Sequence, residues 1–202
     1  MIRRRIGVID YGVGNHASVA SALTSLGHRC RTTHDRDELA ACELLVLPGV
    51  GAFPAAMQAL HAYGLVEFIQ QRARLGTPML GICLGMQLFA DGSSENGETV
   101  GLGLIPGRVE PSSEIGWHIG WNSLAVTNGN SRFARADGAL VYFNHSYFFQ
   151  VPAEYEVAQA RHHRPFAAAV QRGRILGMQF HPEKSQAAGR MLLHDAIEGL
   201  CA

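Results

Sequence analysis

The first hundred residues alternate between short apolar runs and stretches whose apolar residues recur at helical spacing. The apolar runs predict buried strands at 6–10, 44–49 and 78–82, and the helical spacing predicts helices at 15–27, 53–76 and 84–92. Gly27 is expected to end the first helix, and Gly64 to interrupt the second. Strands that alternate with helices indicate an α/β protein with a flavodoxin-like, mostly parallel sheet and helices on both faces.

From about residue 101 the pattern changes to short β-like runs separated by turn residues. Strands or hairpins are predicted within 102–111, 120–126, 140–151, 156–162 and 166–180, and a helix follows over 187–202. We expect these strands to extend the same sheet or to lie beside it. Because no repeat, low-complexity tract or linker divides the sequence, residues 1–202 are expected to form a single domain.

The composition argues against several classes of protein. Hydrophobic residues make up 47% of the 202 residues, which is typical of a globular chain. The formal net charge is zero, whereas a nucleic-acid-binding domain usually carries a basic excess. No segment has the roughly 20 apolar residues that a membrane-spanning helix needs, and Asp10 interrupts the apolar run after the basic N-terminus, so no signal peptide is expected. Neither nucleic acid nor a membrane is therefore expected as a partner.

The chain contains four cysteines without paired spacing: Cys30, Cys42, Cys83 and Cys201. Their scatter indicates a cytoplasmic protein and argues against a disulfide scaffold or a cysteine zinc site. Cys83 lies between Gly81 and Gly85, in the G-x-nucleophile-x-G pattern of a nucleophile elbow. The glycines would make room for a tight turn, and a helix beginning at Leu84 would favour a thiolate. The alternative is a buried structural cysteine, the usual fate of a free thiol.

A base and a carboxylate to orient it occur together in the segment GMQFHPEKS. Glu183 lies two residues after His181, where extended backbone would place both side chains on one face. Glu183 could then fix the tautomer of His181 and leave the other ring nitrogen for Cys83, in a Cys–His–Glu triad. The alternatives are a surface pair or half of a metal site. No metal is expected, because the further candidate ligands His145, His162 and His163 do not have the sequence spacing of a known metal site.

Two glycine-containing turns follow predicted strands. The turn at residues 48–51 could present the backbone N–H of Val50 or Gly51 to an oxyanion, together with that of Leu84, although an ordinary strand-end turn would have the same sequence. Residues 12–17 match the dinucleotide-binding pattern G-x-G-x-x-A, with acidic residues about 20 positions further on. Because short glycine motifs recur by chance, a nucleotide-binding module is kept as an alternative from another functional class.

Several motifs taken together resemble the class I glutamine amidotransferase domain. They stand in family order over nearly the whole chain: PGVGAF, GICLGMQLF, GLGLIPGRV, IGWN, YFNHSY and GMQFHPEKS. The cysteine and His-Pro-Glu motifs specify the superfamily. The opening VIDYGVGNHASVASAL and the Gly-Trp-Asn and His-Ser-Tyr motifs are similar to a narrower family, the glutaminase subunit of imidazole glycerol phosphate synthase from histidine biosynthesis.

The resemblance implies that Cys83 attacks the side-chain amide of glutamine, while His181 transfers protons and Glu183 orients it. It implies an oxyanion site at the backbone amides of Val50 and Leu84. It also implies a glutamine pocket that contains Gly49, Gly51, Gln87, Glu95, His145, Ser146 and Tyr147. Ammonia would pass to a (β/α)8 cyclase in a heterodimer that makes imidazole glycerol phosphate and AICAR. Because such a barrel needs about 250 residues, the cyclase is expected to be another polypeptide. No cofactor is expected.

One segment, EIGWHIGWN, departs from the family pattern. The family usually has a basic residue, an apolar residue and Pro-His-Met before Gly-Trp-Asn. Here His118 is kept, but Ile115 stands for the basic residue and Trp117 for the proline. Because this segment lies near the partner interface in the family, a second reading stays open. In that reading the glutaminase feeds ammonia to a different synthase, such as an enzyme of surface-sugar biosynthesis.

Overall fold

The computed structural model of the protein describes residues 2–112, 116–127 and 131–202. Within these residues the largest sheet has eight strands in the order β2-β1-β3-β4-β14-β13-β12-β9. The strands are β1 (Arg5–Ile9), β2 (Arg29–Thr33), β3 (Leu44–Gly49), β4 (Met79–Cys83), β9 (Ala125–Val126), β12 (Glu156–His162), β13 (Arg164–Arg172) and β14 (Ile175–Met178). The first five in the spatial order are parallel and follow the 2-1-3-4-5 order of flavodoxin-like sheets. The predicted fold class is confirmed.

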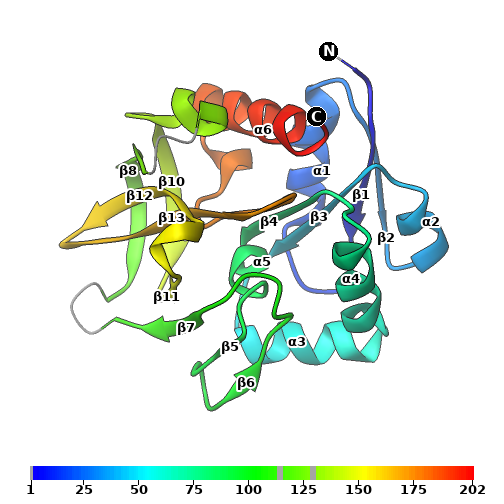
Figure 1. The fold of residues 1–202 in the computed structure, drawn as a ribbon, viewed down its shortest axis with the longest axis horizontal. Helices are drawn as coiled ribbons and strands as arrows, with labels where there is room; N and C mark the ends of the chain where they lie inside the picture. Colours follow the sequence, from blue (N-terminus) through cyan, green and yellow to red (C-terminus); the bar gives the residue numbers. More distant parts are fainter. Residues whose placement is uncertain (1, 113–115, 128–130) are drawn as a thin grey trace.

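The central strands are buried on both faces, because successive side chains point to opposite sides of the sheet. In β3, Leu44 and Val46 belong to one apolar cluster, whereas Leu45 and Leu47 belong to a second one. The first cluster is covered by α1 (His16–Ser25) and α6 (Gln186–Leu200), and the second by α2 (Arg36–Ala40), α3 (Phe53–Ala62) and α4 (Leu65–Arg74). Figure 1 shows α1 and α6 on one side of the sheet and α3 and α4 on the other. Burial of each such side chain stabilises the fold by roughly 1.5–3 kcal/mol, so the strand ends are held firmly in place.

The helical region predicted at 53–76 is interrupted at Gly64, as expected. This residue has a φ of 63° and lies between α3 and α4. A left-handed backbone costs a residue with a side chain roughly 1–2 kcal/mol, so glycine is favoured at this position. The interruption lets the chain turn between two helices that pack on the same face of the sheet.

The second half of the chain extends the large sheet and adds two smaller ones, as predicted. Beyond β14, the strands β13, β12 and β9 continue the large sheet in antiparallel fashion. One smaller sheet pairs β8 (His118–Ser123) with β10 (Leu140–His145); the other contains β5 (Gly92–Ser93), β6 (Thr99–Val100), β7 (Arg108–Pro111) and β11 (Tyr147–Gln150). The 3-10 helices are η1 (Ser131–Ala136), η2 (Ala153–Tyr155) and η3 (Pro182–Lys184). None of the helices in the described part of the chain has the length and apolar character needed to cross a membrane.

The run at 140–151 contains two strands, β10 and β11, which belong to different sheets, and the chain turns between them at Ser146. One predicted element is wrong in extent. The helix predicted over 84–92 is reduced to the single turn α5 (Leu84–Gln87). Tighter turns follow it, in which the Ala90 N–H donates to the Gln87 carbonyl, and Gly92 then begins β5, where it pairs with Val100 of β6.

Candidate active site

Cys83 occupies a strained turn between β4 and α5, as expected for a nucleophile elbow. Its φ is 55° and its ψ is −113°, a conformation that residues with a side chain rarely adopt. A Cβ on Gly85 would lie 1.8 Å from the Leu47 carbonyl oxygen, and one on Gly81 would lie 2.6 Å from the Phe89 ring. Both glycines are therefore required for the elbow to pack against its neighbours, and the steric reason expected from the sequence is confirmed.

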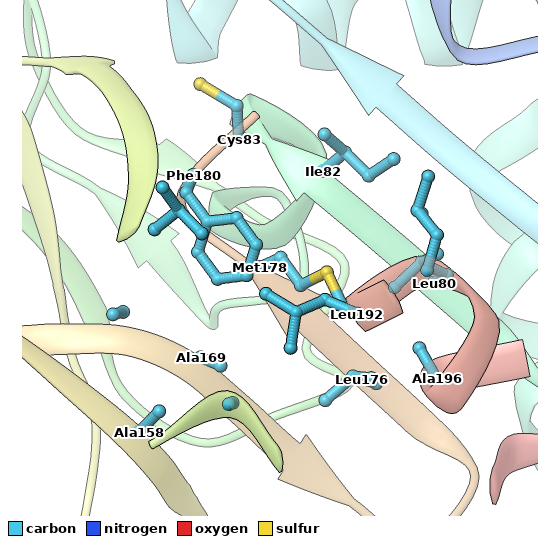
Figure 2. Close-up of a cluster of buried hydrophobic side chains, with 14 of the residues drawn as sticks. Leu80, Ile82, Cys83, Ala158, Ala169, Leu176, Met178, Phe180, Leu192 and Ala196 are labelled. Carbon is cyan, nitrogen blue, oxygen red and sulfur yellow. The ribbon is translucent and has the colours of Figure 1, made fainter. Parts of the chain in front are cut away.

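The Cys83 sulfur is turned away from the core. The residue is 5% exposed and belongs to an apolar cluster that includes Ile82 and Phe180. Figure 2 shows its side chain pointing away from the other side chains of that cluster. Cys83 lines a cavity of about 210 Å³ together with His181. A thiol in this position can contact a small ligand in the cavity, whereas the thiol of a structural core cysteine cannot.

His181 and Glu183 form a buried pair beside Cys83. The Nδ1 atom of His181 lies 2.8 Å from Glu183 Oε1, and both side chains are almost completely buried. The imidazole also interacts with the Cys83 side chain. Glu183 reaches His181 through the 3-10 turn η3 and not through extended backbone. The predicted pairing of the two side chains is confirmed, whereas the predicted backbone geometry is wrong, because Pro182 begins a helical turn.

The charge of His181 follows from these contacts. Burial lowers the pKa of His181, but its interactions with Cys83 and Glu183 outweigh this effect and raise the pKa from 6.5 to about 9. At neutral pH the imidazolium can therefore balance a thiolate on Cys83, the reactive form of a cysteine. Its proton is also held where a leaving amine would need one.

The loop after β1 supports this pair, although its sequence matches a nucleotide-binding pattern. Asn15 Nδ2 donates to Glu183 Oε1, the same oxygen that contacts His181. Tyr11 donates its hydroxyl to the Pro48 carbonyl at 2.8 Å, and burial, followed by the charge of Cys83, raises the pKa of Tyr11. Sequence reasoning missed both residues. Asn15 and Glu183 are 168 positions apart, so only the fold brings them together.

The predicted oxyanion turn borders the same cavity. Val50, Gly51 and Leu84 all line it. Gly51 has a φ of 101°, and a Cβ there would meet nothing within 4 Å, so backbone conformation and not packing requires this glycine. Gly49 was expected to line the pocket as well, but it is not among the lining residues. It lies behind the turn, where a Cβ would come within 2.7 Å of the Tyr11 hydroxyl.

The structure brings the remaining predicted glutamine-binding residues together. The cavity is lined by Gln87, Glu95, His145, Ser146 and Tyr147. Glu95 Oε2 accepts a hydrogen bond from the Phe53 N–H at 2.7 Å, which ties this carboxylate to the start of α3. His145 Nδ1 donates to the Tyr147 carbonyl at 3.0 Å, and burial lowers the pKa of His145 to about 3. His145 therefore faces the cavity as a neutral imidazole at physiological pH.

Three further cavity residues were not among the predicted ones: Trp117, Asn144 and Lys184. Trp117 Nε1 donates to Asn144 Oδ1 at 3.2 Å, and the backbone carbonyl oxygen of Asn144 lies 3.9 Å from Cys83 Sγ, from which it can accept a hydrogen bond. Trp117 is one of the two departures from the family pattern; the other, Ile115, lies outside the described residues. Lys184 and Glu95 give the cavity one positive and one negative side chain. A zwitterionic ligand would require one group of each charge.

The histidines that could have suggested a metal instead contact one another. His118 Nδ1 lies 3.2 Å from His145 Nε2, and the His118 ring stacks on His162. Burial, with a smaller contribution from His162, lowers the pKa of His118 to about 4, so the pair is neutral at physiological pH. Over residues 2–112, 116–127 and 131–202, no three His, Cys, Asp or Glu side chains are grouped so that they could hold a metal ion.

The fold and the Cys–His–Glu arrangement together define a class of enzyme, and the family described as glutamine amidotransferase class-I matches residues 7–198. The chain belongs to the class I glutamine amidotransferases. Within that class it belongs to the family of imidazole glycerol phosphate synthase subunit HisH. The HisH protein of Streptococcus gordonii is 47% identical over 190 residues, which cover 92% of each chain. That of Carboxydothermus hydrogenoformans is 45% identical over 197 residues, which cover 96% of this chain and 98% of the relative.

Solved structures share the fold at lower sequence identity. The structure of PurLQS from Thermotoga maritima superposes with a TM-score of 0.78 at 19% identity, and covers 98% of this chain and 100% of its own. A crystal structure of a glutamine amidotransferase superposes with a TM-score of 0.75 at 20% identity, over 97% and 98% of the two chains. At this level of identity the likeness supports the fold alone.

Proposed function

We propose that the protein is the glutaminase of an ammonia-channelling complex. It hydrolyses glutamine to glutamate and passes the ammonia to a (β/α)8 cyclase subunit, which makes imidazole glycerol phosphate and AICAR in histidine biosynthesis. The proposal rests above all on the position of Cys83. This residue is held on a strained elbow, lines a cavity and lies beside the buried pair of His181 and Glu183. Relatives at 40–47% identity bear the name imidazole glycerol phosphate synthase subunit HisH.

In the first half of the reaction, the Cys83 sulfur attacks the side-chain carbonyl carbon of glutamine. As the C–S bond forms, the carbonyl oxygen becomes negatively charged. The backbone N–H groups of Val50 and Leu84 then donate hydrogen bonds to this oxyanion. The oxyanion then collapses, the C–N bond breaks, and the nitrogen leaves as ammonia with a proton from His181. Glu183 keeps the imidazole oriented and balances its positive charge.

In the second half, water releases the product. Neutral His181 takes a proton from water while the water oxygen attacks the thioester carbon. The C–S bond then breaks, glutamate leaves, and the sulfur returns as the thiolate beside the imidazolium. Each residue of the triad is thus used in both halves of the reaction.

Residues of opposite charge support an amino acid as the substrate. Glu95 offers a carboxylate to the α-ammonium group of glutamine, and Lys184 offers a cation to its α-carboxylate. The walls of the site also include Gly51, Gln87, His145, Ser146 and Tyr147. Gly49 does not line the cavity; because it has no side chain, β3 can pack closely against the elbow.

An exposed apolar surface beside the cavity supports a protein partner. Four large apolar side chains on or next to β8 and β10 are exposed: Trp117, Ile119, Trp121 and Leu140. Surfaces of this kind mark interaction sites on proteins that otherwise bury such side chains. In the proposal this surface docks the cyclase, the whole chain 1–202 acts as one cytoplasmic domain, and neither nucleic acid nor a membrane is a partner.

The departure at Trp117 favours one second candidate, the same glutaminase serving a different synthase. A pull-down with the tagged chain, followed by a glutamine-dependent assay of the recovered partner, separates the two. Recovery of a barrel cyclase that makes imidazole glycerol phosphate from glutamine supports the proposal. Recovery of another ammonia-accepting synthase, active with glutamine, supports the second candidate and contradicts the first.

A further inference from the structure

Gln179 approaches the reacting sulfur from the strand next to the elbow. The strands β4 and β14 are parallel, and Met178 pairs with Ile82, so the chain next places Gln179 beside Cys83. The Gln179 side chain is buried, with 1% of its surface exposed, and its Nε2 lies 3.8 Å from Cys83 Sγ. This distance suits a hydrogen bond from an amide to sulfur.

The orientation of the Gln179 amide is fixed by its neighbours. A backbone carbonyl can only accept, so Gln87 must turn its nitrogen toward the Tyr147 carbonyl, which lies 3.0 Å from it. The same nitrogen lies 2.9 Å from Gln179 Oε1. Because the oxygen of Gln179 faces Gln87, its nitrogen must face Cys83. Gln87 thus donates both to the Tyr147 carbonyl and to Gln179, and Gln179 in turn donates to the sulfur.

The groups around the Cys83 sulfur differ in whether they can hydrogen-bond to the neutral thiol or to the thiolate. The backbone carbonyl of Asn144 can accept a hydrogen bond from the neutral thiol, but it has no hydrogen to donate to a thiolate. Gln179 and protonated His181 can both donate to a thiolate. A donor to sulfur helps at the two moments when sulfur carries charge, before it attacks the amide and when it leaves the thioester.

We propose that Gln179 is a further catalytic residue, whose side-chain N–H stabilises the Cys83 thiolate and whose orientation is imposed by Gln87 and the Tyr147 carbonyl. This inference rests on the proposed glutaminase function for its role in turnover. The hydrogen bond itself can be tested without any substrate, because a thiolate reacts with alkylating agents far faster than a thiol does.

Two substitutions test the hydrogen bond in different ways. Gln179→Glu keeps an oxygen that can accept from Gln87 but places a carboxylate oxygen against the sulfur. Gln179→Met keeps the approximate length of the side chain and removes both polar groups. As a matched control, Gln70→Met removes an amide that donates to the Leu102 carbonyl at 3.0 Å, on α4 and outside the active-site cavity.

The measurement is the rate at which iodoacetamide alkylates Cys83 at neutral pH, followed by peptide mapping. The three half-buried thiols at Cys30, Cys42 and Cys201 serve as internal references. Loss of a hydrogen bond to a charged group predicts that both Gln179 variants slow alkylation of Cys83 about tenfold, while Gln70→Met leaves it unchanged. Thermal melting identifies variants that fold, and either folded Gln179 variant is sufficient.

A wild-type rate of Cys83 alkylation in a folded Gln179 variant would overturn the inference. Glutamine turnover is measured on the same samples with the partner present, where kcat should fall by a similar factor and KM should change little. Slower alkylation in a protein whose wild type forms no glutamate would support the hydrogen bond and contradict the proposed function instead. The two failures are thus distinguishable.

Discussion

The charge on Glu183 sets the protonation of His181, and Glu183→Gln removes that charge while keeping the shape of the side chain. Both Asn15 and His181 place donors against Oε1, so the amide oxygen of the variant must take that position. The amide nitrogen then replaces Oε2, which is buried and has no hydrogen-bond partner among the described residues. The geometry of the pair should therefore survive the substitution.

The size of the effect follows from the pKa of His181. The difference between 6.5 and about 9 corresponds to roughly 3 kcal/mol. Cys83 and Glu183 together supply this stabilisation of the imidazolium and also offset the cost of its burial. Removal of one of the two charges should lower the pKa of His181 by about one unit or more.

The direct assay is an NMR titration of the His181 ring nitrogens, in the wild type and in Glu183→Gln. Asp195→Asn is a matched control, because it removes the carboxylate beside His194 on α6, away from the active-site cavity. The free energy of unfolding of the wild type should also depend on the protonation of His181. A raised pKa means that the contribution of protonated His181 is complete below pH 6.5 and is lost as the pH rises through about 9. An unchanged His181 midpoint in Glu183→Gln would refute the reasoning.

The remaining predictions concern the elbow, the base, the oxyanion turn and the histidine pair. Cys83→Ser should lower glutamine hydrolysis by several orders of magnitude and leave thermal melting unchanged, while added ammonia still supports the partner; retained hydrolysis would contradict this. His181→Ala should lower kcat more than Glu183→Gln, since the imidazole moves the protons; equal rates in both variants and the wild type would show that the pair takes no part in turnover. The free subunit should hydrolyse glutamine about 10²–10³-fold more slowly than the complex with its partner and an acceptor analogue, because Gly51 lets the Val50 peptide turn away from the oxyanion; equal steady-state rates would rule this gating out. The free energy of unfolding should fall as the pH drops from 6.5 to about 4, because the lowered pKa values keep His118 and His145 neutral in the fold; a flat profile in denaturant titrations would exclude this role.

The sequence predicted the elements whose pattern reflects burial on both faces. Continuous apolar runs revealed β1, β3 and β4, and Gly64 revealed the break between α3 and α4. It did not predict β2, because an edge strand with the sequence RCRTT is largely exposed and carries no apolar run. The split of 140–151 was also invisible, since both strands are rich in aromatic residues and only tertiary pairing separates them.

The site was predictable where its residues occur in local motifs. The elbow around Cys83 and the segment with His181 and Glu183 carry their chemistry in a few adjacent positions. The supporting contacts of Asn15 and Asn144 join residues that are 168 and 61 positions apart, so no spacing rule could reveal them. Gln179 stands inside a recognised motif, yet its role emerges only from the parallel register of β14 and β4.

The central claim is that Cys83 forms a thioester with glutamine, and rapid trapping of that intermediate tests it most directly. The complex with its partner would be mixed with isotopically labelled glutamine, quenched in acid within the first turnover and digested for mass spectrometry. The account predicts a labelled glutamyl group on the peptide that contains Cys83, and none on the same peptide of Cys83→Ser. Glutamate formation at the wild-type rate without label on Cys83, or label that persists in Cys83→Ser, would contradict it.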